Sequence, residues 1–354
     1  MRLRQTSRPL APIDITIRGA GIFGLSIAWA CARRGAHVRV IDPHGPGAGS
    51  SGGLVGALAP HVPENWNVKK AFQLDSLLMA EGFWAGVTAA GGVDPGYVRS
   101  GRLQPVAEEA LPLARARGEG AAELWQGRAV WEVIPAAEAG PWAPLSPSGF
   151  LIRDTLTALL HPRRACAALT AALAVRGIEI TPEGEDTGRV LHATGAAGLA
   201  ELSAALGRNV GGAVKGQAAL LRHAAPGAPQ LFVDGLHIVP HLDGTVAIGS
   251  TSERDFDDPT GTDAQLDTLV ERARAALPIL HGAPVVARWA GLRPRSRSRA
   301  PMLGAHPLHP GQFIANGGFK IGFGMAPKVA EVMADLLLEG RDEIPEAFRV
   351  EASM

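Results

Sequence analysis

The sequence predicts an α/β fold in which a dinucleotide-binding unit is interrupted by an antiparallel, β-rich part. Three observations indicate this fold. Residues 13–42 read as a strand, a glycine turn, a helix and a second strand; residues 91–149 and 215–289 are rich in short strand patterns; and residues 312–339 again read as a strand, a glycine loop and a helix. Because 354 residues are enough for two domains, we expect a discontinuous domain made of residues 1–90, 150–214 and 290–354, and a second made of residues 91–149 and 215–289.

Composition and charge exclude several classes of protein. Hydrophobic residues make up 46% of the chain and charged residues 19%, and the formal net charge of zero gives no global field that would attract nucleic acid or an anionic membrane. The two cysteines, Cys31 and Cys166, fall in predicted helices, so we expect neither a disulfide framework nor a metal site. Residues 1–12 lack the apolar core of a signal peptide, and no run of about 18 apolar residues predicts a membrane span. We therefore expect a cytoplasmic enzyme.

The first glycine turn, Gly-Ala-Gly-Ile-Phe-Gly over residues 19–24, has the spacing of a dinucleotide-binding motif. Gly19 permits the tight turn, Gly21 lets a pyrophosphate approach the backbone, and Gly24 lets the helix pack closely on the strand. The helix N-terminus that follows favours an anion. Asp42 ends the second strand, where a carboxylate binds the ribose hydroxyls. The first strand carries Asp14, Thr16 and Arg18, although a central parallel strand is expected to be apolar on both faces.

The elements that follow are predicted from periodicity and turn residues. A glycine- and serine-rich loop over residues 43–57 can lie against a flat ligand, and a helix follows over about residues 67–88. Residues 97–106 read as a hairpin-forming pair of strand pieces, residues 129–133 as a strand and residues 141–149 as a loop. Next come a helix over residues 162–176, a strand over residues 178–180, and a strand from residue 189 that ends in a small-residue turn at Thr194 and Gly195.

The second half reads as an antiparallel sheet and then a helical C-terminus. Strands are predicted over residues 217–222, 231–233, 237–240 and 245–248, with a turn at Asp243 and Gly244. A polar loop over residues 251–258, a helix over residues 264–277 and a strand over residues 285–289 follow. Residues 312–324 form the second strand and glycine loop, and a long amphipathic helix then runs to residue 339.

Four separated motifs resemble one family. They are residues 19–24 with Asp42; residues 49–54 (Gly-Ser-Ser-Gly-Gly-Leu); residues 192–195 (His-Ala-Thr-Gly); and residues 289–294 (Trp-Ala-Gly-Leu-Arg-Pro) paired with residues 317–324. Their order and spacing over nearly the whole chain resemble the D-amino-acid oxidase (DAO) family of FAD-dependent oxidoreductases, in particular its glycine oxidase-like branch. The resemblance implies a Rossmann-like FAD-binding domain of the glutathione-reductase type and an interleaved antiparallel β-sheet substrate domain.

The resemblance also implies which residues contact an extended FAD. Residues 19–24 would hold the pyrophosphate, residues 50–57 would line the flavin side, and residues 318–324 would run under the flavin pyrimidine edge, where a helix N-terminus stabilises negative charge. The implied contacts are Gly19, Gly21, Ile22, Phe23, Gly24, Asp42, Ser50, Ser51, Val55, Gly56, Ala57, Thr194, Gly195, Gly318, Phe319, Ile321, Gly322, Phe323 and Gly324.

The substrate side of the resemblance falls on four residues. Arg293 lies where the branch holds a substrate carboxylate, for which a guanidinium fork is well suited, and Lys320 lies where the branch carries a second cation. His237 lies where the branch places an aromatic residue facing the substrate, and His61 could close the pocket. For both histidines a purely structural position in the core or at the rim is left open.

Departures from the family limit the chemistry. No cysteine follows Arg293 and no histidine lies in residues 50–53, so FAD is expected to be non-covalent. Residues 181–189 are shorter than the hairpin that the family places there. Tyr97 is the only tyrosine, so a tyrosine-lined pocket is not expected.

The implied reaction is hydride transfer from the Cα–H of glycine, a D-amino acid or an N-alkyl amino acid to flavin N5, giving an imine that water hydrolyses. Oxygen or another acceptor would then reoxidise the flavin. Three alternatives remain open: an enzyme that modifies an aminomethyl group of tRNA, an NAD-dependent dehydrogenase, and a non-catalytic flavin protein. The arginine-rich run over residues 288–299 prompts the tRNA alternative. Without such a role, this run is predicted to be a solvated loop. Neither the particular substrate nor the oligomeric state follows from the sequence.

Overall fold

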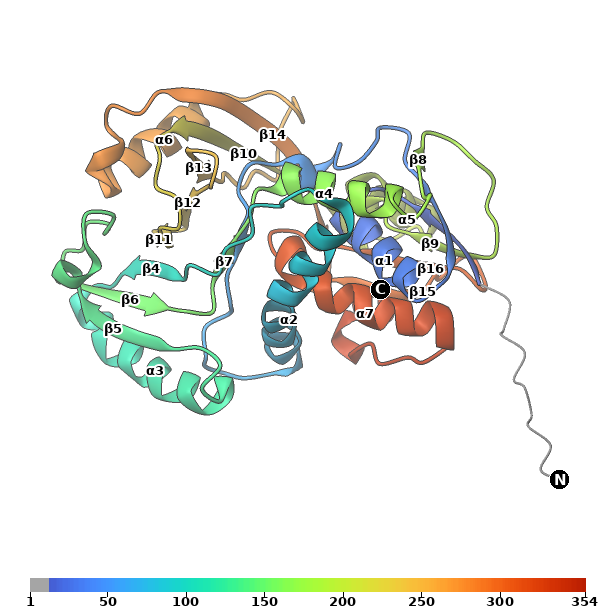
Figure 1. The fold of residues 1–354 in the computed structure, drawn as a ribbon, viewed down its shortest axis with the longest axis horizontal. Helices are drawn as coiled ribbons and strands as arrows, with labels where there is room; N and C mark the ends of the chain where they lie inside the picture. Colours follow the sequence, from blue (N-terminus) through green and yellow to red (C-terminus); the bar gives the residue numbers. More distant parts are fainter. Residues whose placement is uncertain (1–12) are drawn as a thin grey trace.

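The computed structural model describes residues 13–354; the prediction that residues 1–12 are not a signal peptide lies outside the described residues. Two sheets lie at opposite ends of the molecule, and helices α2 and α4 lie between them (Figure 1). Within residues 13–354, no helix has both the length and the apolar character needed to cross a membrane.

The first sheet has six strands in the order β15-β16-β9-β1-β2-β8. The pairs from β16 to β8 are parallel and β15 is antiparallel to β16. The strand bounds are β1 Asp14–Arg18, β2 His37–Ile41, β8 Ile180–Thr181, β9 Arg189–His192, β15 Met302–Ala305 and β16 Phe313–Asn316. The predicted unit of strand, glycine turn, helix and strand over residues 13–42 is confirmed. The predicted strand that begins at residue 189 is confirmed as β9.

The alternating polar residues of β1 have a local explanation. The Thr16 hydroxyl donates to the Thr187 carbonyl and accepts from the Thr187 amide, both at 2.9 Å, and Arg18 pairs with Asp186 at 2.8 Å. The short segment over residues 182–188 therefore covers one face of β1, where a longer hairpin was expected from the family. Hydrogen bonding satisfies the buried hydroxyl, which has no exposed surface.

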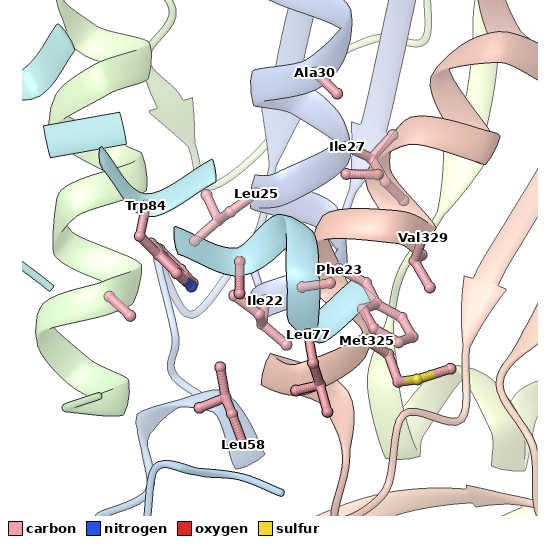
Figure 2. Packing of buried hydrophobic residues seen from close by; sticks show 14 of the residues in the cluster. Ile22, Phe23, Leu25, Ile27, Ala30, Leu58, Leu77, Trp84, Met325 and Val329 are labelled. Carbon is pink, nitrogen blue, oxygen red and sulfur yellow. The ribbon is translucent and has the colours of Figure 1, made fainter. Parts of the chain in front are cut away.

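Four helices pack against one another beside the first sheet. They are α1 Ile22–Arg33, α2 Val68–Gly91, α4 Pro162–Ala174 and α7 Gly322–Glu339. Helix α2 begins where the Asn67 side chain accepts a hydrogen bond from the Lys70 amide and ends at Gly92, which has a left-handed φ of 71°. Leu25 of α1, Leu77 of α2 and Met325 of α7 belong to one buried hydrophobic cluster, in which Leu77 lies beside Met325 (Figure 2).

The second sheet has eight strands in the order β14-β10-β13-β12-β11-β4-β6-β5. All of its recorded pairs are antiparallel except β11 with β4. The bounds are β4 Arg102–Pro105, β5 Trp131–Pro135, β6 Phe150–Asp154, β10 Gly211–Arg222, β11 Gln230–Val233, β12 Leu236–Pro240, β13 Thr245–Gly249 and β14 Val285–Ser296. Helix α3 (Leu111–Trp125) packs on β5 and helix α6 (Ala264–Ala276) on β10. A third, two-stranded sheet joins β3 (Ala57–Leu58) to β7 (Ala158–Leu159).

Two expectations about elements are wrong. Residues 97–106 do not form a hairpin. Val98 forms a bridge with Leu159, and β4, which follows the turn at Gly101 (φ +79°), pairs with β6 and β11. The arginine-rich run over residues 288–299 is not a loop, because β14 continues to Ser296 along β10. In both cases pairing with distant strands overrides the local pattern.

Several elements were not predicted, including the short strands β3, β7 and β15, strand β6 and helix α5 (Gly195–Ala205). The glycine- and alanine-rich sequence of α5 carries no clear apolar period. Residues 150–154 were grouped with the first domain but form β6 of the eight-stranded sheet. The exact division into domains stays a prediction.

Candidate active site

The first glycine motif forms a closely packed turn between β1 and α1. Gly19 has φ +108°, and a Cβ there would collide with the Ala193 carbonyl at the end of β9. A Cβ on Gly24 would collide with the Gly19 carbonyl, so the helix lies directly on the turn. Gly21 precedes α1 and has no side chain to cap it, and the Ser51 hydroxyl accepts a hydrogen bond from only one amide of the first turn, that of Ile22. Backbone amides at the first turn of α1 are therefore available for an anionic group.

Asp42 holds the same turn in place. Its two carboxylate oxygens accept hydrogen bonds from the Ala20 amide at 2.7 Å and the His44 amide at 2.9 Å. The structure thus places Asp42 at the end of β2, beside the glycine turn, as the motif requires. Since a carboxylate has about four acceptor positions, these two bonds leave capacity for ribose hydroxyls.

The second glycine loop meets the first. A Cβ on Gly318 would lie 2.9 Å from Cζ of Phe23 in α1, and one on Gly322 would lie 3.4 Å from Cγ2 of Ile22. Helix α7 begins after this loop, without a side-chain cap from any described residue. The N-termini of two helices from opposite ends of the chain therefore lie side by side, and both favour negative charge.

Asn316 ties this loop to the small-residue turn at Thr194 and Gly195. Its side-chain amide donates to the Gly195 carbonyl at 2.9 Å, and its side-chain oxygen accepts from the Gly317 amide at 2.7 Å. Asn316 is buried and was missed in the sequence, where it read only as the end of a strand. The structure thereby brings three of the four motifs together at the carboxyl ends of β1, β9 and β16.

The serine- and glycine-rich loop connects the two sheets. The buried Ser51 hydroxyl accepts from the Ile22 amide at 2.9 Å, and a Cβ on Gly53 would lie 3.3 Å from the Trp289 ring of β14. Val55 packs on Gly249 at the end of β13. Ser50 lies in the same 3-10 turn as Ser51, while Gly56 packs on the Leu160 carbonyl and Ala57 pairs with Leu159 in the two-stranded sheet.

Three residues of the second loop pack into the protein interior. A Cβ on Gly324 would contact Leu77 at 3.4 Å, and Ile321 and Phe323 are half-buried against the main hydrophobic core. Phe319, by contrast, has a left-handed φ of 43° and is surrounded by cations. Among the predicted cofactor contacts of the second loop, Gly318 therefore lies where the backbone approaches α1, whereas Ile321, Phe323 and Gly324 pack against the protein core.

Arg293 is buried in the second sheet, with a relative exposure of 7%. Its guanidinium donates to the Ser250 hydroxyl at 3.0 Å and to the Thr251 carbonyl at 2.7 Å, and it lies directly over Gly216, where a Cβ would collide with it. Its Nε has no hydrogen-bond partner among residues 13–354. Burial lowers the Arg293 pKa to about 10, against an opposing effect of the Glu253 charge, so the side chain stays a cation at neutral pH.

One carboxylate serves two buried cations here. Glu253 lies 3.4 Å from Lys215, with side-chain exposures of 8% and 5%, and also accepts hydrogen bonds from Thr251 and Gln217. Thr251 in turn accepts the Arg293 bond at its carbonyl. Lys215 also lies within electrostatic reach of Asp258 and Asp263, whereas Glu253 is the carboxylate whose charge acts on Arg293. The Arg293 charge is therefore incompletely compensated, which suits an anionic ligand. Thr251 and Glu253 were expected only as part of a polar loop over residues 251–258, and Ser250 was not singled out.

Further cations gather around Phe319. The charged groups of Arg293, Arg295 and Lys320 lie 5.8, 5.2 and 5.7 Å from the Phe319 ring centroid. Partial desolvation, with the charges of Arg293 and Arg295, lowers the pKa of the exposed Lys320. The structure therefore brings Lys320 and Arg293 together, as the resemblance implies, and adds Arg295.

His237 lies within the electrostatic reach of Lys320. It occupies β12, its ring is 4.7 Å from the Phe232 ring, and its Nδ1 has no hydrogen-bond partner in the part of the chain that the structure describes. Desolvation, and then the charges of Arg102 and Lys320, lower the His237 pKa to about 3, so the ring is neutral.

His61 is placed differently. Its amide donates to the Gln73 side chain at 2.8 Å, and its exposed ring contacts the same Gln73 oxygen. Within residues 13–354, no recorded bond or charge links His61 to Arg293, Lys320 or His237, so the structure does not bring it into this group.

These features define an α/β enzyme in which two adjacent helix N-termini offer a dinucleotide site, and in which Arg295 and Lys320 lie beside the buried Arg293 around Phe319. The pattern of the family described as "FAD dependent oxidoreductase" (DAO) matches residues 14–336, and the chain belongs to this family. It is therefore an FAD-dependent oxidoreductase, and the predicted fold class is confirmed. The starts of α1 and α7, where the Ile22 amide is the one that meets a capping side chain among the described residues, and the glycine cradle fit the phosphates and flavin of that cofactor.

Known proteins of similar sequence and structure agree. The glycine oxidase of Geobacillus kaustophilus is 29% identical over 92% of this chain and 92% of its own. A solved structure of glycine oxidase from Geobacillus kaustophilus superposes with a TM-score of 0.80 at 23% identity, covering 96% of this chain and 98% of the other. The iminodiacetate oxidase of a Chelativorans species gives a TM-score of 0.82 at 21% identity, covering 95% and 98%.

Proposed function

We propose that this protein oxidises the C–N bond of a small amino acid, namely glycine, a D-amino acid or an N-alkyl amino acid. The observation that carries the proposal is the buried Arg293, which is held by Ser250 and Thr251 and is only partly compensated by Glu253. A buried cation without a full counter-charge gains most from a ligand carboxylate that it can grip with its planar fork. The names of the two oxidases reported above support an amino-acid substrate.

Arg293 would bind the substrate carboxylate and so orient Cα toward the cofactor site. Lys320 and Arg295 add positive charge beside Arg293 around Phe319, and the neutral His237 of β12 lies within reach of the Lys320 charge without adding charge itself. Bound FAD would supply the hydride acceptor, and the substrate imine would be hydrolysed by water. The chain's own contribution is to bind, to orient and to supply an electrostatic field.

We infer that Gly19, Gly21, Asp42 and Ser51 hold the pyrophosphate and ribose side of FAD, and that Gly318 and the start of α7 lie by the flavin. The two adjacent helix N-termini support this assignment, because each directs its positive end to the site. Asn316 would keep the two glycine segments in register.

We also propose that FAD is held without a covalent bond. Cys31 and Cys166 are buried in helices, and burial raises the pKa of each thiol to about 12, so neither is a ready nucleophile. Acid precipitation should release all of the yellow flavin into the supernatant. Flavin that stays with the precipitated protein would contradict non-covalent binding. The cytoplasmic location stays a prediction.

The alternatives are less well supported. In an NAD-dependent dehydrogenase the second glycine loop would have no function, and the family to which the chain belongs is FAD-dependent. A tRNA-modifying role rested on the run of arginines, but Arg288 pairs with Asp267, and Arg293 and Arg295 lie at Phe319. The acceptor that reoxidises the flavin is proposed to be oxygen, as the names of the related oxidases suggest.

An anaerobic screen tests the function. Flavin-loaded protein is mixed with glycine, N-methyl and N-carboxymethyl amino acids, D-amino acids and cyclic imino acids, and the flavin absorbance is followed. We expect at least one of these substrates to bleach the flavin, and oxygen to restore it. Flavin that no member of the set reduces would support the non-catalytic reading and overturn the proposal.

A further inference from the structure

Away from Arg293 and the glycine motifs, two histidines and an aspartate lie close together where the start of α4 meets the turn between β12 and β13. His161 immediately precedes α4, whereas His241 and Asp243 lie in the turn between β12 and β13. One ligand atom of each residue lies within 4.8 Å of the others. The three come from sequence positions about 80 residues apart, and the sequence analysis predicted no metal.

The hydrogen bonds of these side chains leave ligand atoms unused. His241 is 1% exposed, and its Nε2 has no partner among the described residues; its Nδ1 faces the Thr245 hydroxyl at 3.3 Å. His161 Nε2 is 4.0 Å from the Asp243 carboxylate, which is too long for a hydrogen bond. The other Asp243 oxygen accepts from the Thr245 amide and hydroxyl. A buried imidazole nitrogen without a partner is costly and calls for a ligand.

The spacing suits a metal ion. A tetrahedral centre with bonds of about 2.0–2.2 Å holds its ligand atoms about 3.3–3.6 Å apart, so small side-chain rotations would bring the three atoms into position. The rings of His161 and His241 face each other with centroids 4.6 Å apart. Desolvation lowers the pKa of both, that of His241 to about 4, which leaves the neutral imidazoles that metals bind.

We propose that His161, His241 and Asp243 form a binding site for a divalent d-block cation such as Zn²⁺, with water in the fourth position. Two imidazoles and one carboxylate favour such an ion over Mg²⁺ or Ca²⁺, which prefer oxygen ligands. The site is independent of the flavin and of the proposed reaction. Its effect would be structural: the ion would fasten the β12–β13 turn to the start of α4. Strand β12 carries His237, and β13 leads to Ser250 and Thr251.

The test uses flavin-loaded protein that has first been stripped of metal with a chelator. Titration with ZnCl₂ in a calorimeter should show one tight site, and Zn²⁺ should raise the melting temperature. In Asp243→Asn, the Oδ1 bonds to Thr245 are kept while the charge is lost, so the metal-free variant should melt as the metal-free wild type does. Since loss of an outer-shell partner alone weakens metal binding about 10–100-fold, removal of a ligand in Asp243→Asn or His241→Gln should weaken it at least as much.

A second histidine cluster is the matched control. His192, His306 and His309 lie with ring centroids 4.5–6.0 Å apart, but among the described residues only His161, His241 and Asp243 bring three ligand atoms within 4.8 Å of one another. His306→Gln should leave the Zn²⁺ affinity unchanged. Equal Zn²⁺ affinity in the wild type and Asp243→Asn, or loss of binding in His306→Gln instead, would overturn the proposal.

Discussion

At the scale of single residues, the site around Arg293 contains buried positive charge that Glu253 compensates only in part. Lys215 and Arg293 are both largely shielded from water, and Glu253 is the carboxylate placed near both. Desolvated charges are tolerated only when they are paired. Lys215 also has the Asp258 and Asp263 charges within reach, so Arg293 is the cation that gains most from a second anion. If the substrate carboxylate is that anion, as proposed, substrate binding also stabilises the protein.

Glu253→Gln should therefore destabilise the protein and make its stability depend more on ligand. Removing one partner of a buried ion pair costs about 3–5 kcal/mol, because the remaining charge is left uncompensated. A small carboxylate such as glycolate should then raise the melting temperature more in Glu253→Gln than in the wild type. Glu331→Gln, which removes the partly exposed pair with Lys328, is the control and should change stability by less than about 1 kcal/mol. An equal ligand effect in wild type and Glu253→Gln would show that Glu253 does not balance Arg293.

At the scale of elements, the proposed cofactor site consists of two helix starts and the glycines that let them approach each other. Gly19 fixes the turn before α1 against β9, and Gly318 fixes the turn before α7 against Phe23. Neither contact leaves room for a side chain. The geometry of the backbone, and not the chemistry of side chains, therefore determines most of the affinity that we expect for FAD.

Gly19→Ala and Gly35→Ala separate this close packing from simple backbone strain. Both glycines have positive φ, at 108° and 87°, but an added Cβ collides with the Ala193 carbonyl only at Gly19; at Gly35 it meets nothing within 4 Å. Strain alone costs about 1–3 kcal/mol at either position. We expect Gly35→Ala to keep its flavin and Gly19→Ala to lose most of it, measured as the ratio of flavin to protein absorbance. Flavin retained equally by both variants would contradict the assigned role of Gly19.

The sequence predicted the elements that carry local signals and missed those that depend on distant partners. The unit over residues 13–42 was evident because glycines and apolar residues occur at fixed spacing. Strand β14 was predicted only to residue 289, since the glycine, proline and arginine residues of its second half have low strand propensity and are held by β10. Arg293 was found through the family motif, but Ser250, Thr251 and Glu253, which position and balance it, gave no local signal.

At the scale of the whole molecule, several histidines are kept neutral by burial, and this couples stability to pH. The pKa of His237 is lowered to about 3, and those of His241 and His306 to about 4, in each case chiefly by desolvation. The unfolded chain binds protons at these residues near pH 6.5, whereas the folded chain does not. Stability is therefore fully present above pH 6.5 and is lost as the pH falls toward 4.

His237→Gln should flatten this dependence. Between pH 7 and pH 5, in buffer with a chelator, the wild type should lose stability, and His237 should account for on the order of 1–2 kcal/mol of the loss at pH 5. Thermal unfolding of both proteins at the two pH values measures the difference. Parallel decreases in wild type and variant would mean that His237 titrates alike in the folded and unfolded states.

The steady-state kinetics and flavin content of Arg293→Ala, beside Arg293→Lys, test the central claim most directly. If Arg293 binds the substrate carboxylate, Arg293→Ala should keep its flavin and raise KM for the amino acid identified by bleaching about 100-fold or more, since a charge-assisted bond is worth about 1.5–3 kcal/mol and two are lost. The KM of Arg293→Lys should lie between those of the wild type and Arg293→Ala. An unchanged KM in Arg293→Ala, or loss of its flavin, would contradict the account.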